Sequence, residues 1–460
     1  MKPNLLVIVT DQLRFDCIGF ANAYPVKTPN IDRLFRNGMS FEHAYTSIPL
    51  CCPARQTLMH GRRNETFNAL WNYDLSLPTS ALQPEAYAWP RALQAAGYTT
   101  GYVGKWHVHP TYTPLDYGYH HYVADDQYHR YLQDEGISVE FTQGWLGEVN
   151  PIDLPHAHTH WLGKQAIRLI GKYAKKQAPW HVRLDFYEPH LPCRPIQQFA
   201  EMYKPESIPE WGSFRDEFSN KPYIQRQQLL NWNIEHFTWE DWAPIVARYY
   251  AIISQVDDAI GDILAYLERN QLMDNTVIVF TADHGDMSGG HRMMDKHYIM
   301  YDDVVRVPFV IHYPSGGWKA GIRSDFIYNT LDLPPTILEL LGIEVPEHFT
   351  GKSLVPMLNG DTPKNWRQEV VSTYNGQQFG LYTQRMIRTK KWKYVWNTTD
   401  IDELYDMEQD PSELDNLIDR VDAKILSELR TRLYDILITE GDRLPQNAWM
   451  KHQLVGGHKL

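Results

Sequence analysis

Short, continuous apolar runs alternate with amphipathic stretches through the first three quarters of the chain. Residues 4–9 form the first run, which predicts a strand buried on both faces and ending at Asp11. Similar runs occur at residues 99–103, 182–186, 276–281 and 307–312. Because buried strands separated by helices are typical of parallel sheets covered by helices, the pattern predicts an α/β sandwich with a mostly parallel central sheet.

The helices between these strands are predicted from apolar residues at helical spacing and from the residues at their ends. The segment 29–37 begins with a proline and is followed by Gly38, the usual order at the two ends of a helix. Further helices are predicted at residues 161–173, 244–269 and 333–341.

The pattern changes after Asn359. Residues 386–395 predict a β-hairpin, and residues 423–438 predict a helix. We therefore expect two domains: residues 1–362 hold the sandwich, and residues 363–460 form a small α+β domain packed on it. Two stretches rich in His, Tyr and Trp, at 108–160 and 195–243, are expected to be insertions that shape a substrate pocket.

Composition limits the classes of protein to which this chain can belong. The net charge of -12 argues against nonspecific nucleic-acid binding, and the absence of an apolar run of about 18 residues argues against a transmembrane helix. Four cysteines in 460 residues are too few for a disulfide scaffold. Because the first strand begins almost at Met1, we expect a cytoplasmic location unless a leader has been removed.

Polar residues stand just after several of the predicted strands. Asp11, Lys105, His190 and Asp283 are the clearest examples. Ligands of parallel sheets bind beyond the carboxyl ends of the strands, so these side chains are expected to meet at one edge. Asp11-Gln12 and Asp283-His284 together offer oxygen and imidazole ligands that suit a divalent cation.

Several segments resemble, in order and spacing, the signatures of the type I sulfatases, which belong to the alkaline-phosphatase-like superfamily. The segments are Asp11-Gln12, Cys51-Cys52-Pro53-Ala54-Arg55 with Gly61, Gly104-Lys105-Trp106-His107, Tyr187-Glu188-Pro189-His190-Leu191-Pro192, Thr281-Ala282-Asp283-His284 and Lys296. The resemblance implies an alkaline-phosphatase-like fold and the hydrolysis of a sulfate ester.

The resemblance also implies a role for each matching residue. Cys51 would be oxidised after translation to formylglycine by a maturation enzyme, and the hydrated aldehyde would be the nucleophile. The implied catalytic residues are Cys51, Arg55, Lys105, His107, His190 and Lys296. The implied ligands of one divalent cation are Asp11, Gln12, Asp283, His284 and the modified Cys51. Calcium is the expected ion, with magnesium or manganese as alternatives, and Gln12 departs from the acidic residue that the family often has there.

The alcohol part of the substrate is left open by the sequence. The aromatic insertions favour a small sulfated carbohydrate, with Asn72, His109, Tyr112 and Arg194 as candidate contacts. Two related activities are alternatives, a phosphonate monoester or phosphodiester hydrolase and a choline sulfatase, because both can share the Asp-Gln pair. A noncatalytic carbohydrate-binding protein is the alternative if Cys51 is not modified. Lys105 and His107 in their Gly-Lys-Trp-His context favour a sulfatase.

Overall fold

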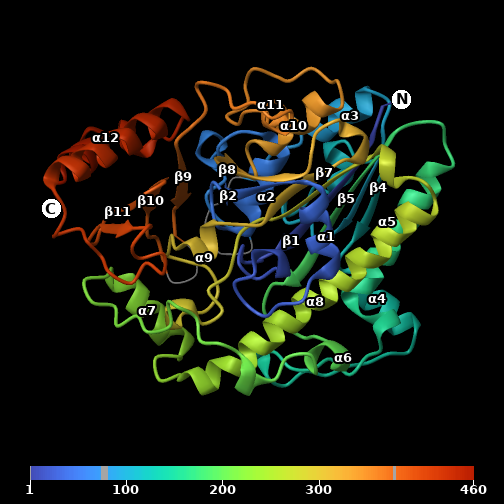
Figure 1. The fold of residues 1–460 in the computed structure, drawn as a ribbon, viewed down its shortest axis with the longest axis horizontal. Coiled ribbons are helices and arrows are strands. Elements are labelled where there is room, and N and C mark those ends of the chain that lie inside the picture. Colours follow the sequence, from blue (N-terminus) through green and yellow to red (C-terminus); the bar gives the residue numbers. More distant parts are fainter. Residues whose placement is uncertain (1, 74–80, 377–379, 460) are drawn as a thin grey trace.

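The computed structural model describes residues 2–73, 81–376 and 380–459. Its centre is an eight-stranded sheet in the order β4-β3-β5-β1-β6-β7-β2-β8 (Figure 1). The strands are β1 (Asn4–Asp11), β2 (Met39–Tyr45), β3 (Thr99–Gly104), β4 (His121–Ala124), β5 (Trp180–Pro189), β6 (Thr276–Ala282), β7 (Phe309–His312) and β8 (Gly321–Tyr328). Only β7 runs antiparallel to its neighbours, so the predicted mostly parallel sheet is confirmed.

Helices cover both faces of this sheet. On one side α1 (Pro29–Asn37), α5 (His158–Ala174) and α8 (Trp239–Arg269) pack together. On the other side α2 (Cys51–His60), α3 (Trp89–Ala95) and α10 (Leu333–Leu340) do the same (Figure 1). The shorter helices are α4 (Gln127–Asp134), α6 (Gln197–Ala200), α7 (Tyr223–Trp232), α9 (Asp302–Val305) and α11 (Val355–Leu358).

The long helix α8 begins at Trp239, ahead of the predicted start at residue 244. Thr238 and Asp241 form a reciprocal capping box, in which each side chain accepts a hydrogen bond from the other's backbone N–H. Pro244 lies inside the helix, where it removes one backbone donor. The cap therefore sets the beginning of the helix, and the proline does not.

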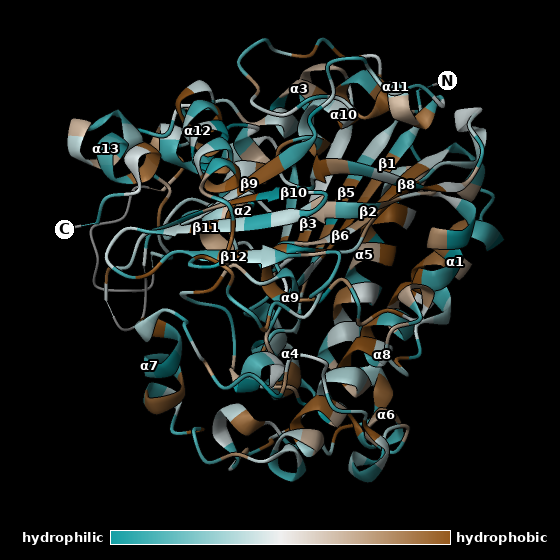
Figure 2. Cartoon of the chain, turned by 60° about the vertical axis from the view of Figure 1, so that its left-hand side comes forward, coloured by the Kyte–Doolittle hydropathy of each residue, from teal (hydrophilic) through white to brown (hydrophobic). Residues whose placement is uncertain are grey.

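The C-terminal part forms a four-stranded antiparallel sheet in the order β12-β11-β10-β9. The strands are β9 (Glu369–Tyr374), β10 (Gln384–Thr389), β11 (Trp392–Asn397) and β12 (Glu403–Asp406), and the helices are α12 (Ala423–Thr439) and α13 (Ala448–Gly456). Figure 2 places α12 and α13 beside this sheet, away from α1, α5 and α8. The small α+β domain is confirmed, while its boundary at residue 363 stays a prediction.

Alternate residues of the small sheet serve two different cores. Val370 and Met386 pack with Ile48 and Leu50 of the large domain. Their neighbours in sequence, Val371 and Ile387, pack against leucines of α12. Because successive side chains of a strand point to opposite faces, one face of the small sheet packs on the large domain and the other face packs on α12.

The order of the strands places four carboxyl ends side by side. β3, β5, β1 and β6 are consecutive in the sheet, and Asp11 at the end of β1 pairs with Pro189 at the end of β5. The edge predicted to bind a ligand therefore joins distant parts of the chain: Gln12 and Asp283, which are hydrogen-bonded there, are 271 positions apart. Within the described residues, no helix combines the length and the apolar character that a membrane span requires.

Candidate active site

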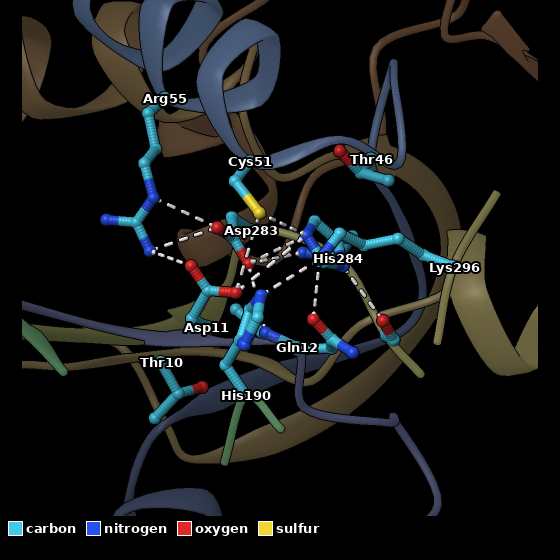
Figure 3. A network of polar contacts seen from close by, with 12 residues as sticks. Thr10, Asp11, Gln12, Thr46, Cys51, Arg55, His190, Asp283, His284 and Lys296 are labelled. Carbon is cyan, nitrogen blue, oxygen red and sulfur yellow. Dashed lines mark hydrogen bonds and ion pairs between the residues drawn. The ribbon is translucent and has the colours of Figure 1, made fainter. Parts of the chain in front are cut away.

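Cys51 is the first residue of α2, and its buried side chain points toward Asp11, Asp283 and His284 (Figure 3). Its Sγ lies 3.2 Å from Nε2 of His284 and 3.7 Å from Oδ1 of Asp11. The free N–H groups of the first turn favour negative charge at this place. Asn72 accepts a hydrogen bond of 2.9 Å from the backbone N–H of Cys52, so this candidate substrate contact also supports the start of α2.

Four side chains form a compact group of metal-ligand type. The ligand atoms of Asp11, Cys51, Asp283 and His284 all lie within 4.8 Å of one another. Nδ1 of His284 is 2.8 Å from the carbonyl oxygen of Gly285. A carbonyl can only accept, so Nδ1 donates to it and Nε2 is the ring nitrogen that faces the group. Two carboxylates, an imidazole nitrogen and the Cys51 position fit a divalent cation.

Arg55 connects this group to a third buried carboxylate. Its guanidinium donates to Asp283 at 3.0 Å, to Asp11 at 2.9 Å and to Asp185 at 2.6 Å. Asp185 was not anticipated from the sequence, although it also pairs with Arg183 at 2.7 Å. Arg183 and Asp185 are two positions apart on a predicted strand, so their side chains lie on the same face. This spacing could have revealed the pair from the sequence.

Lys105 and His107 both approach Cys51 from the loop after β3. Nζ of Lys105 lies 2.7 Å from Oδ2 of Asp11 and 4.7 Å from the centre of the Tyr187 ring. His107 interacts with the Cys51 side chain, and its φ of 47° shows that the backbone there is not extended. Lys105 and His107 therefore both lie at the Cys51 group, on a loop that turns at His107.

Lys296 occupies the other side of the group. Its Nζ donates to Oε1 of Gln12 at 2.7 Å and lies 3.1 Å from Nε2 of His190. The Gln12 amide nitrogen donates to Asp286 and, at 2.8 Å, to Asp295. The Gln12 oxygen thus contacts Lys296, and the place of Gln12 among the metal ligands stays a prediction.

The surrounding cations control the ionisation of the buried acids. Burial alone raises the pKa of Asp11, but Lys105 and Arg55 outweigh it and hold that pKa well below its usual range. Burial and Asp11 raise the pKa of the Cys51 thiol, but Lys296 and Lys105 outweigh them and lower it. Burial and Asp11 raise the pKa of Asp283 to about 6. The position of the Cys51 side chain is therefore one that stabilises an anion.

The remaining candidate contacts lie farther out. His109 accepts hydrogen bonds of 3.0 Å from the backbone N–H groups of Thr111 and Tyr112, and the Tyr112 side chain is 40% exposed. These contacts stabilise a local turn, and no contact of His109 or Tyr112 with the Cys51 group is seen among the described residues. Arg194 lines a cavity that also borders His190.

The chain matches a known family over most of its length. A family model described as sulfatase matches residues 3–343. The chain belongs to the sulfatase family. A second model, for the C-terminal region of N-sulphoglucosamine sulphohydrolase, matches residues 289–438. The protein is therefore a sulfuric ester hydrolase, and the resemblance drawn from its motifs is confirmed.

Individual relatives are similar over nearly the whole chain. The choline-sulfatase of Rhizobium meliloti is 30% identical over 90% of this chain and 82% of its own length. The N-acetylglucosamine-6-O-sulfatase of Bacteroides thetaiotaomicron is 26% identical over 93% of this chain and 85% of its own. The crystal structure of the phosphonate monoester hydrolase of Agrobacterium radiobacter superposes with a TM-score of 0.83 at 25% identity, covering 96% of this chain and 97% of that one.

Proposed function

We propose that the protein hydrolyses the sulfate ester of a small sulfated carbohydrate through a formylglycine made from Cys51. The observation that carries the proposal is the position of Cys51 at the start of α2, with Asp11 and His284 on its sulfur. Asp11, Asp283, His284 and the modified Cys51 would hold one divalent cation, with calcium as the first candidate. When bound, such a cation would polarise the hydrated aldehyde and neutralise the charge of the sulfate.

The chain's own residues account for the proton transfers. Asp283, whose carboxylate lies within 4.8 Å of the Cys51 side chain, accepts the proton of the hydroxyl that attacks sulfur. The leaving alcohol takes its proton from the Lys296–His190 pair, whose nitrogens lie 3.1 Å apart. His107, next to Cys51, then removes the proton of the second hydroxyl, the aldehyde reforms, and sulfate leaves.

The sulfate itself would be held by a ring of cations. Arg55 is held by three carboxylates, Lys105 by Asp11 and Lys296 by Gln12. Groups that are already held in place cost little reorganisation when charge develops during the reaction. This arrangement supports a compact anion with three nonbridging oxygens, such as a sulfate ester.

Phosphonate monoester or phosphodiester hydrolysis is the second candidate, because the fold of such an enzyme matches almost the whole chain. The carbohydrate assignment is supported by the relative that acts on N-acetylglucosamine 6-O-sulfate. A maturation enzyme as partner and a cytoplasmic location stay part of the proposal.

Two measurements test the proposal. The protein is produced together with a formylglycine-generating enzyme, and the peptide containing Cys51 is analysed by mass spectrometry. The matured protein is then assayed with sulfated monosaccharides, choline sulfate, aryl sulfates, phosphodiesters and phosphonate monoesters. Formylglycine at residue 51 with the highest kcat/KM on a sulfated sugar is the expected result. Unmodified Cys51 in a fully active preparation would refute the proposal that formylglycine is the nucleophile. A preference for phosphodiesters would favour the second candidate function.

A further inference from the structure

A cavity of about 470 Å³ opens beside the candidate active site. It lies between the insertion 108–160, the residues that follow β5, and α8. Two of its lining residues also face the Cys51 group: His190 contacts Lys296, and the ring of Tyr187 stacks near Lys105. A volume of this size is typical of small-molecule sites. The alcohol part of a sulfate ester held at Cys51 would therefore extend past His190 into this space.

Arg194 brings an available positive charge to the cavity. Its guanidinium lies 3.9 Å from the centre of the Phe141 ring, which fixes the plane of the group. Its Nε atom is buried without a hydrogen-bond partner. Among the described residues no ion pair of Arg194 is found, and Glu148 is the carboxylate that feels its charge. An oriented arginine without a partner is suited to bind a carboxylate in bidentate fashion.

Glu188 supplies an acceptor on the same cavity. Its Oε1 lies 2.8 Å from Nδ1 of His158, whose Nε2 lies 3.0 Å from Oδ1 of Asp125. The second oxygen of Glu188, Oε2, is buried and has no hydrogen-bond partner, and the residue as a whole is 9% exposed. A buried carboxylate oxygen without a donor is costly, so it calls for a donor from the bound molecule. A sugar hydroxyl is such a donor.

We propose that this cavity selects an acidic sugar, a hexuronate, as the alcohol part of the substrate. The hexuronate carboxylate pairs with Arg194, and a ring hydroxyl donates to Oε2 of Glu188. The proposal rests on the proposed function, because the sulfate position at Cys51 defines which part of the substrate enters the cavity. It names the class of sugar that the sulfatase site accepts.

A quaternary ammonium alcohol such as choline fits the same cavity less well. Aromatic faces and carboxylates recognise such cations. Here the face of Phe141 is already covered by Arg194. Both carboxylates are already paired with His158, a second cation in the same wall. A quaternary ammonium has no N–H group to donate to the free Oε2 of Glu188, and it would lie near the cations Arg194 and His158.

The test measures binding, so it does not depend on catalysis. The full-length Cys51→Ala protein serves as parent, because it cannot form the aldehyde. Ligands are methyl glucuronides sulfated at O2, O3 or O4, each compared with the uronamide of the same sulfate by calorimetry. At least one acid should bind about 30-fold more tightly than its amide. This is the usual loss of affinity when one partner of a buried charged pair is neutralised. Adding Arg194→Met should reduce that ratio to within about threefold.

A matched control and clear contrary results complete the design. Arg168→Met, which changes an exposed arginine of α5, should keep the ratio of about 30-fold. Equal binding of acid and amide for all three sulfates would overturn the proposal, as would a ratio that survives Arg194→Met or a tighter complex with choline sulfate. If Arg194→Met does not fold, the ratio in the parent decides. A failure of formylglycine formation would remove turnover in the wild type and leave these binding ratios unchanged, so the two proposals fail separately.

Discussion

The Sγ atom of Cys51 lies 3.2 Å from Nε2 of His284, within the group that also contains Asp11 and Asp283. The next residue, Cys52, meets Asn72 through its backbone N–H. These two adjacent cysteines therefore have different surroundings. Only the side chain of Cys51 reaches the metal-type group.

Replacement of the two cysteines should separate them. Cys51→Ala in protein produced with a maturation enzyme should abolish turnover of every sulfate ester, because it removes the proposed source of the aldehyde. Cys52→Ala is the matched control and should keep much of the activity. Initial rates, with circular dichroism to check folding, provide the measurement. Loss of activity in Cys52→Ala alone would refute the assignment.

Removal of divalent cations should abolish activity and lower thermal stability. Asp11 and Asp283 lie in one group, so a bound cation should stabilise the folded state by mass action. Calcium at about 100 times its Kd should add about 2.7 kcal/mol to the free energy of unfolding. Titration of chelator-treated protein, followed by differential scanning calorimetry, measures this gain. Asp283→Asn should lose most of it, whereas Asp274→Asn, on an exposed turn, should keep it; an unchanged response in Asp283→Asn would exclude this metal site.

The buried His158 should make stability depend on alkaline pH. Burial lowers its pKa, but Glu188 and Asp125 outweigh burial and raise the pKa to about 10. The folded state therefore binds a proton more tightly than the unfolded state, where the pKa is near ~6.5. The stabilisation is fully present below pH ~6.5 and is lost as the pH rises through about 10. The full effect should be on the order of 5 kcal/mol.

Urea unfolding at pH 6, 8 and 10 checks this dependence. The wild type should lose stability steadily over this range, and the His158→Gln protein should lose less, because the glutamine side chain does not titrate. The difference in the free energy of unfolding between wild type and variant at each pH removes the contribution of other titrating groups, which both proteins share. Parallel curves for the two proteins would show that His158 is not charged in the folded state.

A buried lysine holds the two domains together. Nζ of Lys393 lies 2.6 Å from Asp302 of the large domain and 2.6 Å from Glu413. Lys393→Met should lower the free energy of unfolding by about 3 kcal/mol or more. It removes the cation paired with the buried Glu413 and leaves Asp302 with only the more distant Arg306 and Arg388. Lys391→Met is the control, because its pair with Asp406 is half exposed and should be worth less than about 1 kcal/mol. Equal losses in the two variants would contradict this view of the interface.

The sequence predicted those parts of the site that follow from local patterns. Asp11 and Asp283 directly follow continuous apolar strands, so their place at the edge of the sheet could be inferred without a structure. The strands β2 and β8 were not predicted, because neither is a continuous apolar run: β2 carries Glu42 and His43, and the first half of β8 is polar and partly exposed.

Interactions between residues far apart in the chain could not be predicted from the sequence. Asp185 lies inside a buried strand, and its partner Arg55 comes from a helix 130 positions earlier. The stack of Arg194 on Phe141 joins two segments that show no shared pattern. Such pairs depend on the packing of the whole chain, whereas strand ends and helix caps depend on a few neighbouring residues.

Lys105 should distinguish sulfate hydrolysis from phosphodiester hydrolysis. Its Nζ lies 2.7 Å from Asp11 and faces the position where the sulfate oxygens would lie. Lys105→Ala should lower kcat/KM for sulfate esters by at least ~100-fold, or ~2.7 kcal/mol of transition-state stabilisation. The loss should be smaller for phosphodiesters, because their second ester group already fills part of the space around the anion. Both activities are measured on matured wild type and variant, with melting curves to confirm that the variant is folded. A wild type that prefers phosphodiesters over every sulfate ester, with Lys105 dispensable, would assign the site to phosphodiester chemistry.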